Sequence, residues 1–123
     1  MQGVMNLPKV MIVDDDRTST SLLKTLLEMD GFDVVVVTVG QEAMEEAHRF
    51  LPDIFLVDYH LNDMSGIDLI QNLRASEQFR HTPIIMASGR DVGKEARAAG
   101  ADLFLVKPYD PSQLSEQLAS LIQ

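Results

Sequence analysis

Five short apolar runs, rich in Val and Ile, alternate along the chain with helical patterns, and this alternation constrains the fold most strongly. We predict that the runs are buried strands, because Gly, Pro, Asp or Asn flank them as at the ends of strands. Runs this continuous are typical of a parallel sheet covered on both faces. They cover residues 10–13, 34–37, 54–57, 84–87 and 103–106.

After each run, apolar residues recur at helical spacing, although the fourth pattern is short and predicts a weak helix. Asp110 can cap the last helix, and Pro111 fits its first position. Five strand–helix pairs predict an α/β fold, a single doubly wound parallel sheet with right-handed crossovers and helices on both faces. The apolar faces are Leu22, Leu23, Leu26 and Leu27; Ala43, Met44, Ala47 and Phe50; Ile67, Ile70 and Leu73; Ala96 and Ala99; and Leu114, Leu118, Leu121 and Ile122.

Composition narrows the classes of partner. The chain has 123 residues, a length that suits one domain, with 19 Asp+Glu against 10 Lys+Arg and a formal net charge of −9. An acid excess argues against a direct nucleic-acid partner, because such binders usually carry a basic surface. No apolar run approaches the ~20 residues of a membrane span, so no membrane partner is expected. Cysteine is absent, which excludes thiol chemistry and disulfides.

Polar residues follow four of the five apolar runs. In doubly wound sheets, ligands bind beyond the carboxyl ends of the strands, where the strand order reverses. These residues are therefore expected to converge on one rim of the sheet. They are Asp14, Asp15 and Asp16 after the first run, Asp58 after the third, Ser88 after the fourth and Lys107 after the fifth.

This set of side chains suits phosphoryl chemistry. Clustered carboxylates repel one another unless a cation joins them, and carboxylates with water suit Mg²⁺. Lys107 and Ser88 add a positive charge and a hydroxyl that can stabilise a phosphoryl group during transfer. A carboxylate is also a competent nucleophile for phosphorus, giving an aspartyl phosphate. Singly, each residue has an ordinary interpretation as a turn, cap or surface residue.

The sequence resembles the receiver domain of bacterial response regulators over roughly residues 8–122. By this resemblance, residues 8–123 form the receiver domain and residues 1–7 an N-terminal extension, and the strand order is the flavodoxin-like 2-1-3-4-5. The matching motifs are Val-Asp-Asp-Asp at 13–16, Leu-Val-Asp at 56–58, Gly66, Ala-Ser-Gly at 87–89, Gly-Ala-Asp at 100–102 and Val-Lys-Pro at 106–108.

The resemblance implies an acceptor and a metal site. Asp58 is then the phosphoacceptor, which takes its phosphoryl group from a phosphohistidine on a sensor histidine kinase or a histidine phosphotransfer protein. Asp14, Asp15, Asp58 and the backbone carbonyl of His60 are the expected ligands of Mg²⁺. The only chemistry implied is self-catalysed transfer to Asp58 and hydrolysis of the product, in a cytoplasmic signalling domain rather than an enzyme.

The resemblance also implies a switch. Ser88 and Lys107 are expected to contact the phosphoryl group, and Phe104 matches the aromatic switch position. The new charge draws Ser88 inward and Phe104 turns, which alters the surface of the fourth helix, fifth strand and fifth helix. That surface addresses a downstream protein target or a missing output domain. The Lys107–Pro108 bond is expected to be cis.

Several positions depart from the family pattern. His60 and Arg90 lie two residues beyond Asp58 and Ser88, where side chains flank the route of the attacking water. We hypothesise that they tune the lifetime of the phosphoryl group; two solvated surface side chains are the alternative. Ser65 replaces a common acid and is expected to cap the third helix.

The region between the fourth and fifth strands is short. Ser88 and Lys107 are 19 positions apart (107 − 88), around one helical turn less than is usual in the family. The missing residues fall in the fourth helix and its loop. The sequence therefore predicts a truncated or poorly ordered fourth helix and an atypical output surface.

Other functions stay open at this point. The short output region keeps open a receiver-like binding module that acts without phosphorylation. Asp14-x-Asp16-x-Thr18 fits the opening motif of haloacid-dehalogenase-type phosphatases, with Asp14 as nucleophile and Asp16 as acid, but leaves Asp58 unexplained. A flavodoxin is disfavoured because three carboxylates would repel the flavin phosphate.

Overall fold

A computed structural model describes residues 6–122 and contains a five-stranded parallel sheet in the order β2-β1-β3-β4-β5, as expected. The strands are β1 (Lys9–Val13), β2 (Asp33–Val37), β3 (Ile54–Asp58), β4 (Ile84–Ser88) and β5 (Leu103–Val106). The helices are α1 (Arg17–Met29), the 3₁₀ turn η1 (Gly40–Glu42), α2 (Ala43–Phe50), α3 (Gly66–Ala75), α4 (Gly93–Ala99) and α5 (Pro111–Ile122).

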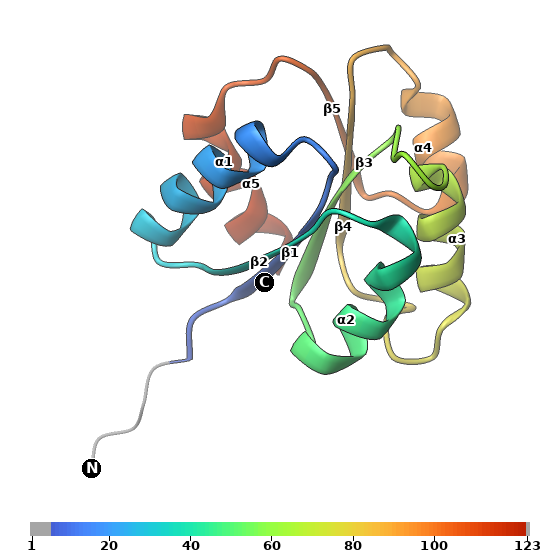
Figure 1. Cartoon of the computed structure of the whole chain (residues 1–123), viewed down its shortest axis with the longest axis horizontal. Helices are drawn as coiled ribbons and strands as arrows, with labels where there is room; N and C mark the ends of the chain where they lie inside the picture. Colours follow the sequence, from blue (N-terminus) through green and yellow to red (C-terminus); the bar gives the residue numbers. More distant parts are fainter. Residues whose placement is uncertain (1–5, 123) are drawn as a thin grey trace.

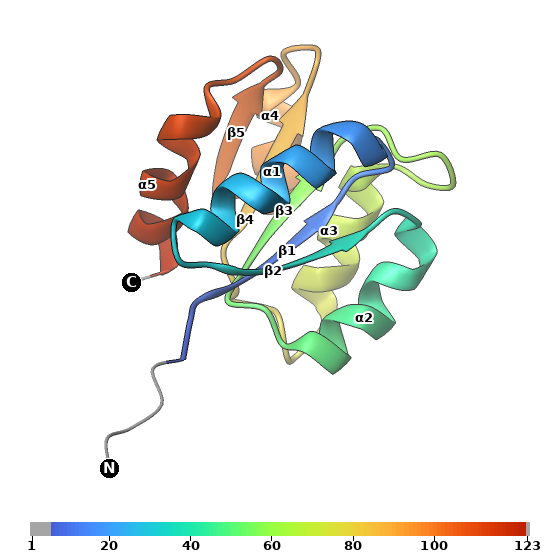
Figure 2. The same ribbon diagram turned by 60° about the vertical axis from the view of Figure 1, so that its left-hand side comes forward.

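Helices cover both faces of the sheet. Figures 1 and 2 show α1 and α5 on one face and α2, α3 and α4 on the other. Successive strand residues point to opposite faces, so Met11 and Val13 pack toward α2–α4, whereas Val10 and Ile12 pack toward α1 and α5. The predicted layers are therefore confirmed, and both faces of the central strands are buried.

The strand at one edge of the sheet departs from the prediction. The run 103–106 was expected to be buried, but β5 is half-buried and Val106 is 48% exposed. β5 pairs only with β4 and lies at the edge of the sheet, so its outer side has no neighbouring strand. An apolar run alone does not distinguish an edge strand from a central one.

The leucine face of α1 is also narrower than predicted. Leu23 and Leu27 are buried, but Leu22 is 63% exposed and Leu26 is 36% exposed. Neighbouring residues on a helix point about 100° apart, so only the Leu23–Leu27 row reaches the core. The other two leucines remain at the surface.

The predicted helix ends are largely confirmed. Gly31 adopts φ 96° just after α1, a left-handed conformation that favours glycine. The hydroxyl of Ser65 accepts a hydrogen bond from the N–H of Ile67 at 3.1 Å, so Ser65 caps α3. Asp110 caps α5 through the N–H of Ser112 at 2.9 Å. The Ser65 and Asp110 caps mark where the loops after β3 and β5 end at the sheet rim.

Helix α4 has seven residues, about two turns, so the truncated form of the predicted fourth helix is the one observed. It ends at Gly100, whose φ of 121° lies in the left-handed region. The Lys107–Pro108 peptide bond is cis, as expected.

The proposed N-terminal extension, residues 1–7, lies mostly outside the described residues. Among residues 6–122, no helix combines the length and apolar character needed to cross a bilayer.

Candidate functional site

Lys107 and two carboxylates form the centre of the predicted rim. Asp14 follows β1 and Asp58 ends β3, its neighbour in the sheet. The Nζ of Lys107 lies 2.9 Å from Oδ2 of Asp14 and 2.8 Å from Oδ1 of Asp58. Both carboxylate side chains are only 12% exposed, so the ion pairs are largely shielded from water. The expected convergence of these three residues is therefore observed.

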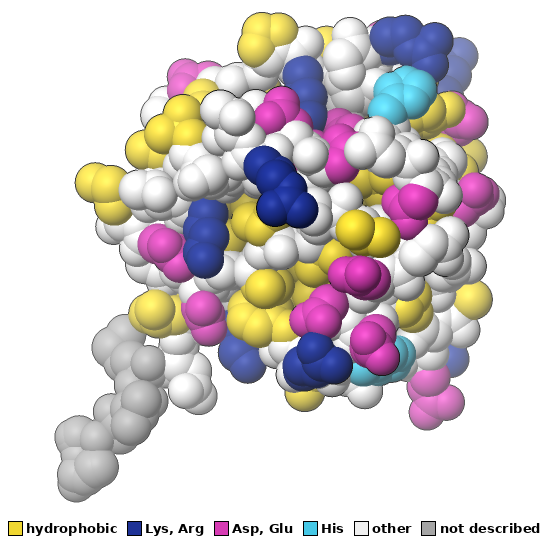
Figure 3. Space-filling model, in the orientation of Figure 1, with side chains coloured by type: hydrophobic (Ala, Val, Ile, Leu, Met, Phe, Trp, Pro, Cys, Tyr) yellow, Lys and Arg dark blue, Asp and Glu magenta, His cyan; other side chains and the backbone are white. Residues whose placement is uncertain are grey.

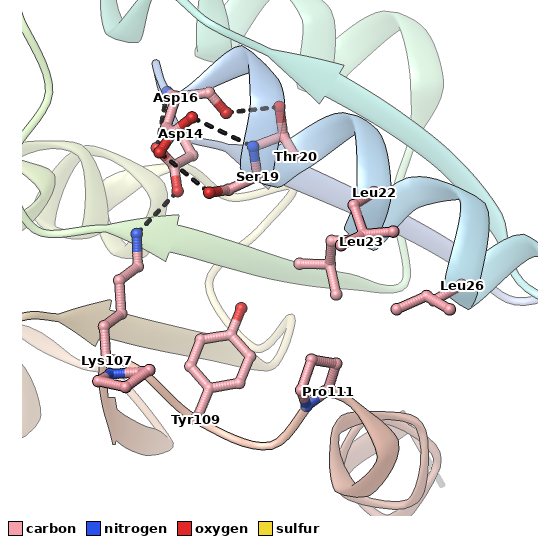
Figure 4. Close-up of a pocket in the computed structure, with 11 residues that line it drawn as sticks. Asp14, Asp16, Ser19, Thr20, Leu22, Leu23, Leu26, Lys107, Tyr109 and Pro111 are labelled. Carbon is pink, nitrogen blue, oxygen red and sulfur yellow. Dashed lines mark hydrogen bonds and ion pairs between the residues drawn. The ribbon is translucent and has the colours of Figure 1, made fainter.

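Strand pairing places the lysine. The backbone N–H of Lys107 donates to the carbonyl of Ser88 at 2.7 Å, which continues the pairing of β4 with β5. Because β4 lies between β3 and β5, the Lys107 side chain must extend across the end of β4 to reach Asp58. Figure 4 shows its ammonium group directed at Asp14.

Three carboxylates lie close enough to hold a cation. Oxygen atoms of Asp14, Asp15 and Asp58 all lie within 4.8 Å of one another. This all-oxygen donor set fits Mg²⁺, which favours carboxylates and retains several waters. The loop that would contribute the carbonyl of His60 is closed by a β-bridge between His60 and Ser65.

Burial and charge shift the pKa values of this cluster. Burial raises the pKa of Asp58 and repulsion from Asp14 adds to the shift, whereas Lys107 opposes it. Burial alone would lower the pKa of Lys107, but its hydrogen bonds to Asp58 and Asp14 raise it. The lysine therefore stays cationic, and each carboxylate depends on a cation to offset its charge.

Ser88 is buried, with 1% exposure. Its Oγ accepts a hydrogen bond from the N–H of Arg90 at 3.2 Å. Within residues 6–122, Ser88 makes no side-chain hydrogen bond to Asp58. The hydroxyl thus holds the start of the β4–α4 loop.

Two contacts link the loop after β3 with the α4 region. The Nη2 of Arg90 lies 3.3 Å from Nε2 of His60, so these two predicted residues are in contact. Sequence reasoning missed the second contact, in which the hydroxyl of Tyr59 donates to Glu95 at 2.8 Å. Tyr59 and Glu95 are 36 residues apart, and no periodic pattern relates them.

Phe104 is half-buried against the core on the α2–α4 face. A Cβ added at Gly93 would lie 3.3 Å from Cδ2 of Phe104, so the first residue of α4 passes close to the ring. A change in the Phe104 rotamer would therefore alter the packing at the start of α4.

A groove opens beside the ion pairs, between α1 and the segment after β5. It has a volume of about 430 Å³, and Figure 4 shows Leu22, Leu26, Tyr109 and Pro111 along it, with Lys107 at one end. The groove therefore combines apolar walls with a charged end at Lys107.

Asp16 does not belong to the charged centre. Its carboxylate accepts hydrogen bonds from the N–H and hydroxyl of Ser19 and caps α1. These bonds hold the pKa of Asp16 below its ordinary value, led by the bond from the Ser19 backbone. A general acid needs the opposite shift, which argues against the phosphatase interpretation.

The remaining acids do not extend the site. Figure 3 shows acidic side chains at many places on one face of the molecule, with Lys and Arg between them. On this face the acids are thus dispersed, and among residues 6–122 the one acidic group able to hold a metal ion is Asp14, Asp15 and Asp58.

Comparisons with known proteins agree with this geometry. The family pattern described as "Response regulator receiver domain" matches residues 10–119. The transcriptional regulatory protein CpxR of Escherichia coli K12 is 37% identical over 120 residues, which cover 94% of this chain and 49% of that protein. The phosphate regulon transcriptional regulatory protein PhoB of Rhizobium meliloti is 34% identical over 122 residues, 95% of this chain and 53% of that protein.

Solved structures show the same arrangement. The chemotaxis response regulator CheY4 of Vibrio cholerae superimposes with a TM-score of 0.87 at 28% identity, covering 94% of this chain and 99% of that one. A receiver domain from Methylobacillus flagellatus gives a TM-score of 0.84 at 33% identity, covering 94% and 99%. The chain spans about half the length of the curated relatives it matches. Its sequence and its fold place the chain in the family of response regulator receiver domains.

Proposed function

We propose that the domain accepts a phosphoryl group on Asp58 from a phosphohistidine, with Mg²⁺, as one step of a two-component phosphorelay. The observation that carries this proposal is the pair of contacts from Lys107 to Asp14 and Asp58, beside three carboxylates within 4.8 Å. The donor is a sensor histidine kinase or a histidine phosphotransfer protein. Family membership supports both this donor class and a cytoplasmic location.

The transfer step uses groups of this chain. A carboxylate oxygen of Asp58 attacks phosphorus while the phosphorus–nitrogen bond breaks, and the electron pair stays on the donor imidazole. Lys107, already in contact with Asp58, then pairs with an oxygen of the transferred group. Asp14, Asp15, Asp58 and the His60 carbonyl would hold Mg²⁺, which would supply positive charge near the phosphoryl oxygens. Attack of water on the phosphorus later releases phosphate and restores Asp58.

The switch step uses Ser88 and Phe104. The new charge attracts the Ser88 hydroxyl, which leaves the N–H of Arg90, its present partner. The β4–α4 loop moves with Ser88, and Phe104 turns beneath the start of α4. The surface of α4, β5 and α5 changes as a result and addresses a downstream protein or an output domain.

His60 and Arg90 tune the lifetime of the phosphoryl group in this scheme. Their mutual contact at 3.3 Å supports this role, because it spans the loops that follow β3 and β4. A bridge at this place restricts the approach of water to the group on Asp58.

Intact-mass measurement tests the function. The parent is incubated with a small phosphodonor such as acetyl phosphate, with Mg²⁺ or with EDTA. One phosphoryl adduct is expected with Mg²⁺, strongly reduced with EDTA and absent in Asp58→Asn. Asp53→Asn, a change at the opposite end of β3, is the matched control and is expected to behave as the parent.

A second function has one observation in its favour. The seven-residue α4 departs from the usual output region and favours a binding module that acts without phosphorylation. Absence of an adduct in the parent with Mg²⁺ would support this second function and contradict the first.

A further inference from the structure

Asp63, in the loop between β3 and α3, joins two loops of the rim. One carboxylate oxygen accepts a hydrogen bond from the N–H of Gly40 at 2.9 Å, and the other accepts from the N–H of Gln41 at 2.8 Å. Both donors belong to η1, the turn that leads into α2. A single exposed side chain therefore clamps the start of another element.

The two loops are also in close van der Waals contact at the clamp. A Cβ added at Gly40 would lie 2.6 Å from Cγ of Met64 and 3.0 Å from the Asp63 carboxylate. A larger residue at position 40 would therefore displace the side chains of Met64 and Asp63. The close approach and the two hydrogen bonds hold the loop at the same place.

The clamp joins the loops on either side of β1, the strand that precedes Asp14 and Asp15. In the sheet, β1 lies between β2 and β3, so a bond between the loops that follow β2 and β3 crosses the position of β1. Asp14 and Asp15 follow β1 at that position. The β3–α3 loop is thus bonded to the turn after β2, two strands away from the strand that ends in Asp58.

The same loop is closed at its base. The N–H of Gly66 donates to the carbonyl of Tyr59 at 2.7 Å, and His60 forms a β-bridge with Ser65. These contacts close the loop on itself but do not join it to the rest of the rim. The His60–Arg90 and Tyr59–Glu95 contacts join the start of the loop to the α4 side of the rim, and Asp63 joins its far end to the turn after β2. Asp63 therefore restrains the loop that carries the His60 carbonyl on the side of β1.

We propose that Asp63 is a positioning residue for the Mg²⁺ site, holding the loop that carries the His60 carbonyl before the cation binds. This inference rests on the proposed function, since it takes His60 as a ligand. A loop that is already ordered adds no ordering cost to cation binding. Loss of the clamp is expected to weaken Mg²⁺ binding about 10-fold, as loss of outer partners of metal ligands does.

The test measures Mg²⁺ affinity by calorimetry together with amide hydrogen exchange. Asp63→Asn keeps the shape but turns an amide donor toward an N–H, so one bond is lost. Asp63→Glu keeps the charge but displaces the carboxylate. Both variants are expected to bind Mg²⁺ more weakly, with faster exchange at Gly40 and Gln41. Because Asp63→Glu preserves the charge, its weakening cannot come from a lost negative charge.

Two control variants test whether losing a nearby charge, or losing a hydrogen bond far from the clamp, is enough to weaken Mg²⁺ binding. Glu42→Gln removes an exposed charge next to the clamp, and Asp53→Ala removes the acceptor of the Lys9 N–H, 2.8 Å away at the other end of the sheet. Both are expected to bind Mg²⁺ as the parent does. If Asp63→Asn and Asp63→Glu bind Mg²⁺ as tightly as the parent, the positioning role of Asp63 is contradicted but the metal site is not. A parent that binds no Mg²⁺ would overturn the metal site and the inference together.

Discussion

Each end of the sheet carries one long cationic side chain that gathers several oxygen acceptors, but the acceptors differ in kind. At the carboxyl end of the strands, Lys107 contacts the carboxylates of Asp14 and Asp58. At the opposite end, Arg74 of α3 contacts mostly backbone. It donates to the carbonyls of Phe79, Arg80, Thr82 and Gly100 and to the carboxylate of Asp102.

We interpret the contacts of Arg74 as stabilising the fold and those of Lys107 as serving the proposed chemistry. Carbonyls in the loops before β4 and β5 are fixed once the chain folds, and the planar guanidinium of Arg74 satisfies several of them at once. Carboxylates, in contrast, can hold a metal cation, and one of them can act as a nucleophile toward phosphorus, as the proposed function requires. On this proposal, the network around Arg74 is permanent, whereas the ion pairs of Lys107 rearrange during function.

Replacing Lys107 gives the largest expected effect. Lys107→Ala should slow phosphoryl uptake from acetyl phosphate by about 100-fold or more, the cost of removing one donor from a charge-stabilising site. Intact mass against time measures the rate. Lys24→Ala, at an exposed lysine 4.0 Å from Glu28, is the control and should match the parent. Uptake at the parental rate in Lys107→Ala would contradict the role of Lys107 in phosphoryl transfer.

Replacing Arg74 should give the converse result. Arg74→Ala leaves backbone carbonyls without their donor and is expected to lower the free energy of unfolding by about 2–3 kcal/mol. Urea unfolding measures this change. Phosphoryl uptake should persist at temperatures where the variant is folded. Arg49→Ala, which breaks an exposed pair with Glu46, should cost at most about 0.5 kcal/mol. Equal costs in the two variants would show that the Arg74 network adds nothing.

The two ends also differ in how far the sequence predicts them. Asp14, Asp58 and Lys107 follow apolar runs, and parallel strands bring such positions together, so their convergence could be inferred. Arg74 has no such signal, because its partners are mainly carbonyls of loops whose conformation the residue types do not reveal. The same holds for Asp63, which binds two N–H groups more than 20 residues away.

Within the fold, the pattern of apolar residues predicts which elements form but not how far each is covered. Five strands and their order agree with expectation, whereas Leu22, Leu26 and Val106 are exposed. Exposure depends on whether another element packs against the residue. A residue on an edge strand, or on the side of a helix that faces away from the sheet, has no such neighbour. Leu22 and Leu26 line the groove beside Lys107, whereas Val106 lies on the edge strand β5.

Breaking the contact between His60 and Arg90, at the carboxyl end of the strands, should have a smaller effect than replacing Lys107 or Arg74. Arg90→Ala should shorten the lifetime of the aspartyl phosphate by about 2- to 10-fold, since one hydrogen bond contributes about 0.5–1.5 kcal/mol. Decay of the adduct after removal of the donor measures the lifetime. His60→Ala should have a similar effect, and the double variant should be non-additive. Lifetimes equal to that of the parent would contradict this role.

The smallest expected effect is on the pH dependence of stability and concerns Asp110. This residue follows Lys107 closely in the sequence but caps α5. Hydrogen bonds from the hydroxyl and N–H of Ser112 hold the pKa of Asp110 below its ordinary value. Its contribution to stability is therefore present above the unfolded-state pKa of about 3.9 and is lost as the pH falls through the lower folded-state pKa. Melting temperatures of Asp110→Asn between about pH 5 and pH 2 should fall less steeply than those of the parent. Parallel curves would contradict this assignment.

The most direct test of the account locates the phosphoryl group itself. The protein is phosphorylated with Mg²⁺ and reduced with borohydride, which converts an aspartyl phosphate into homoserine, and tryptic peptides are sequenced by mass spectrometry. We predict homoserine at position 58, in the peptide that spans residues 50–74, and only when the phosphodonor was present. Homoserine at position 14 instead, where the phosphatase interpretation places the nucleophile, or at no aspartate, would contradict the account.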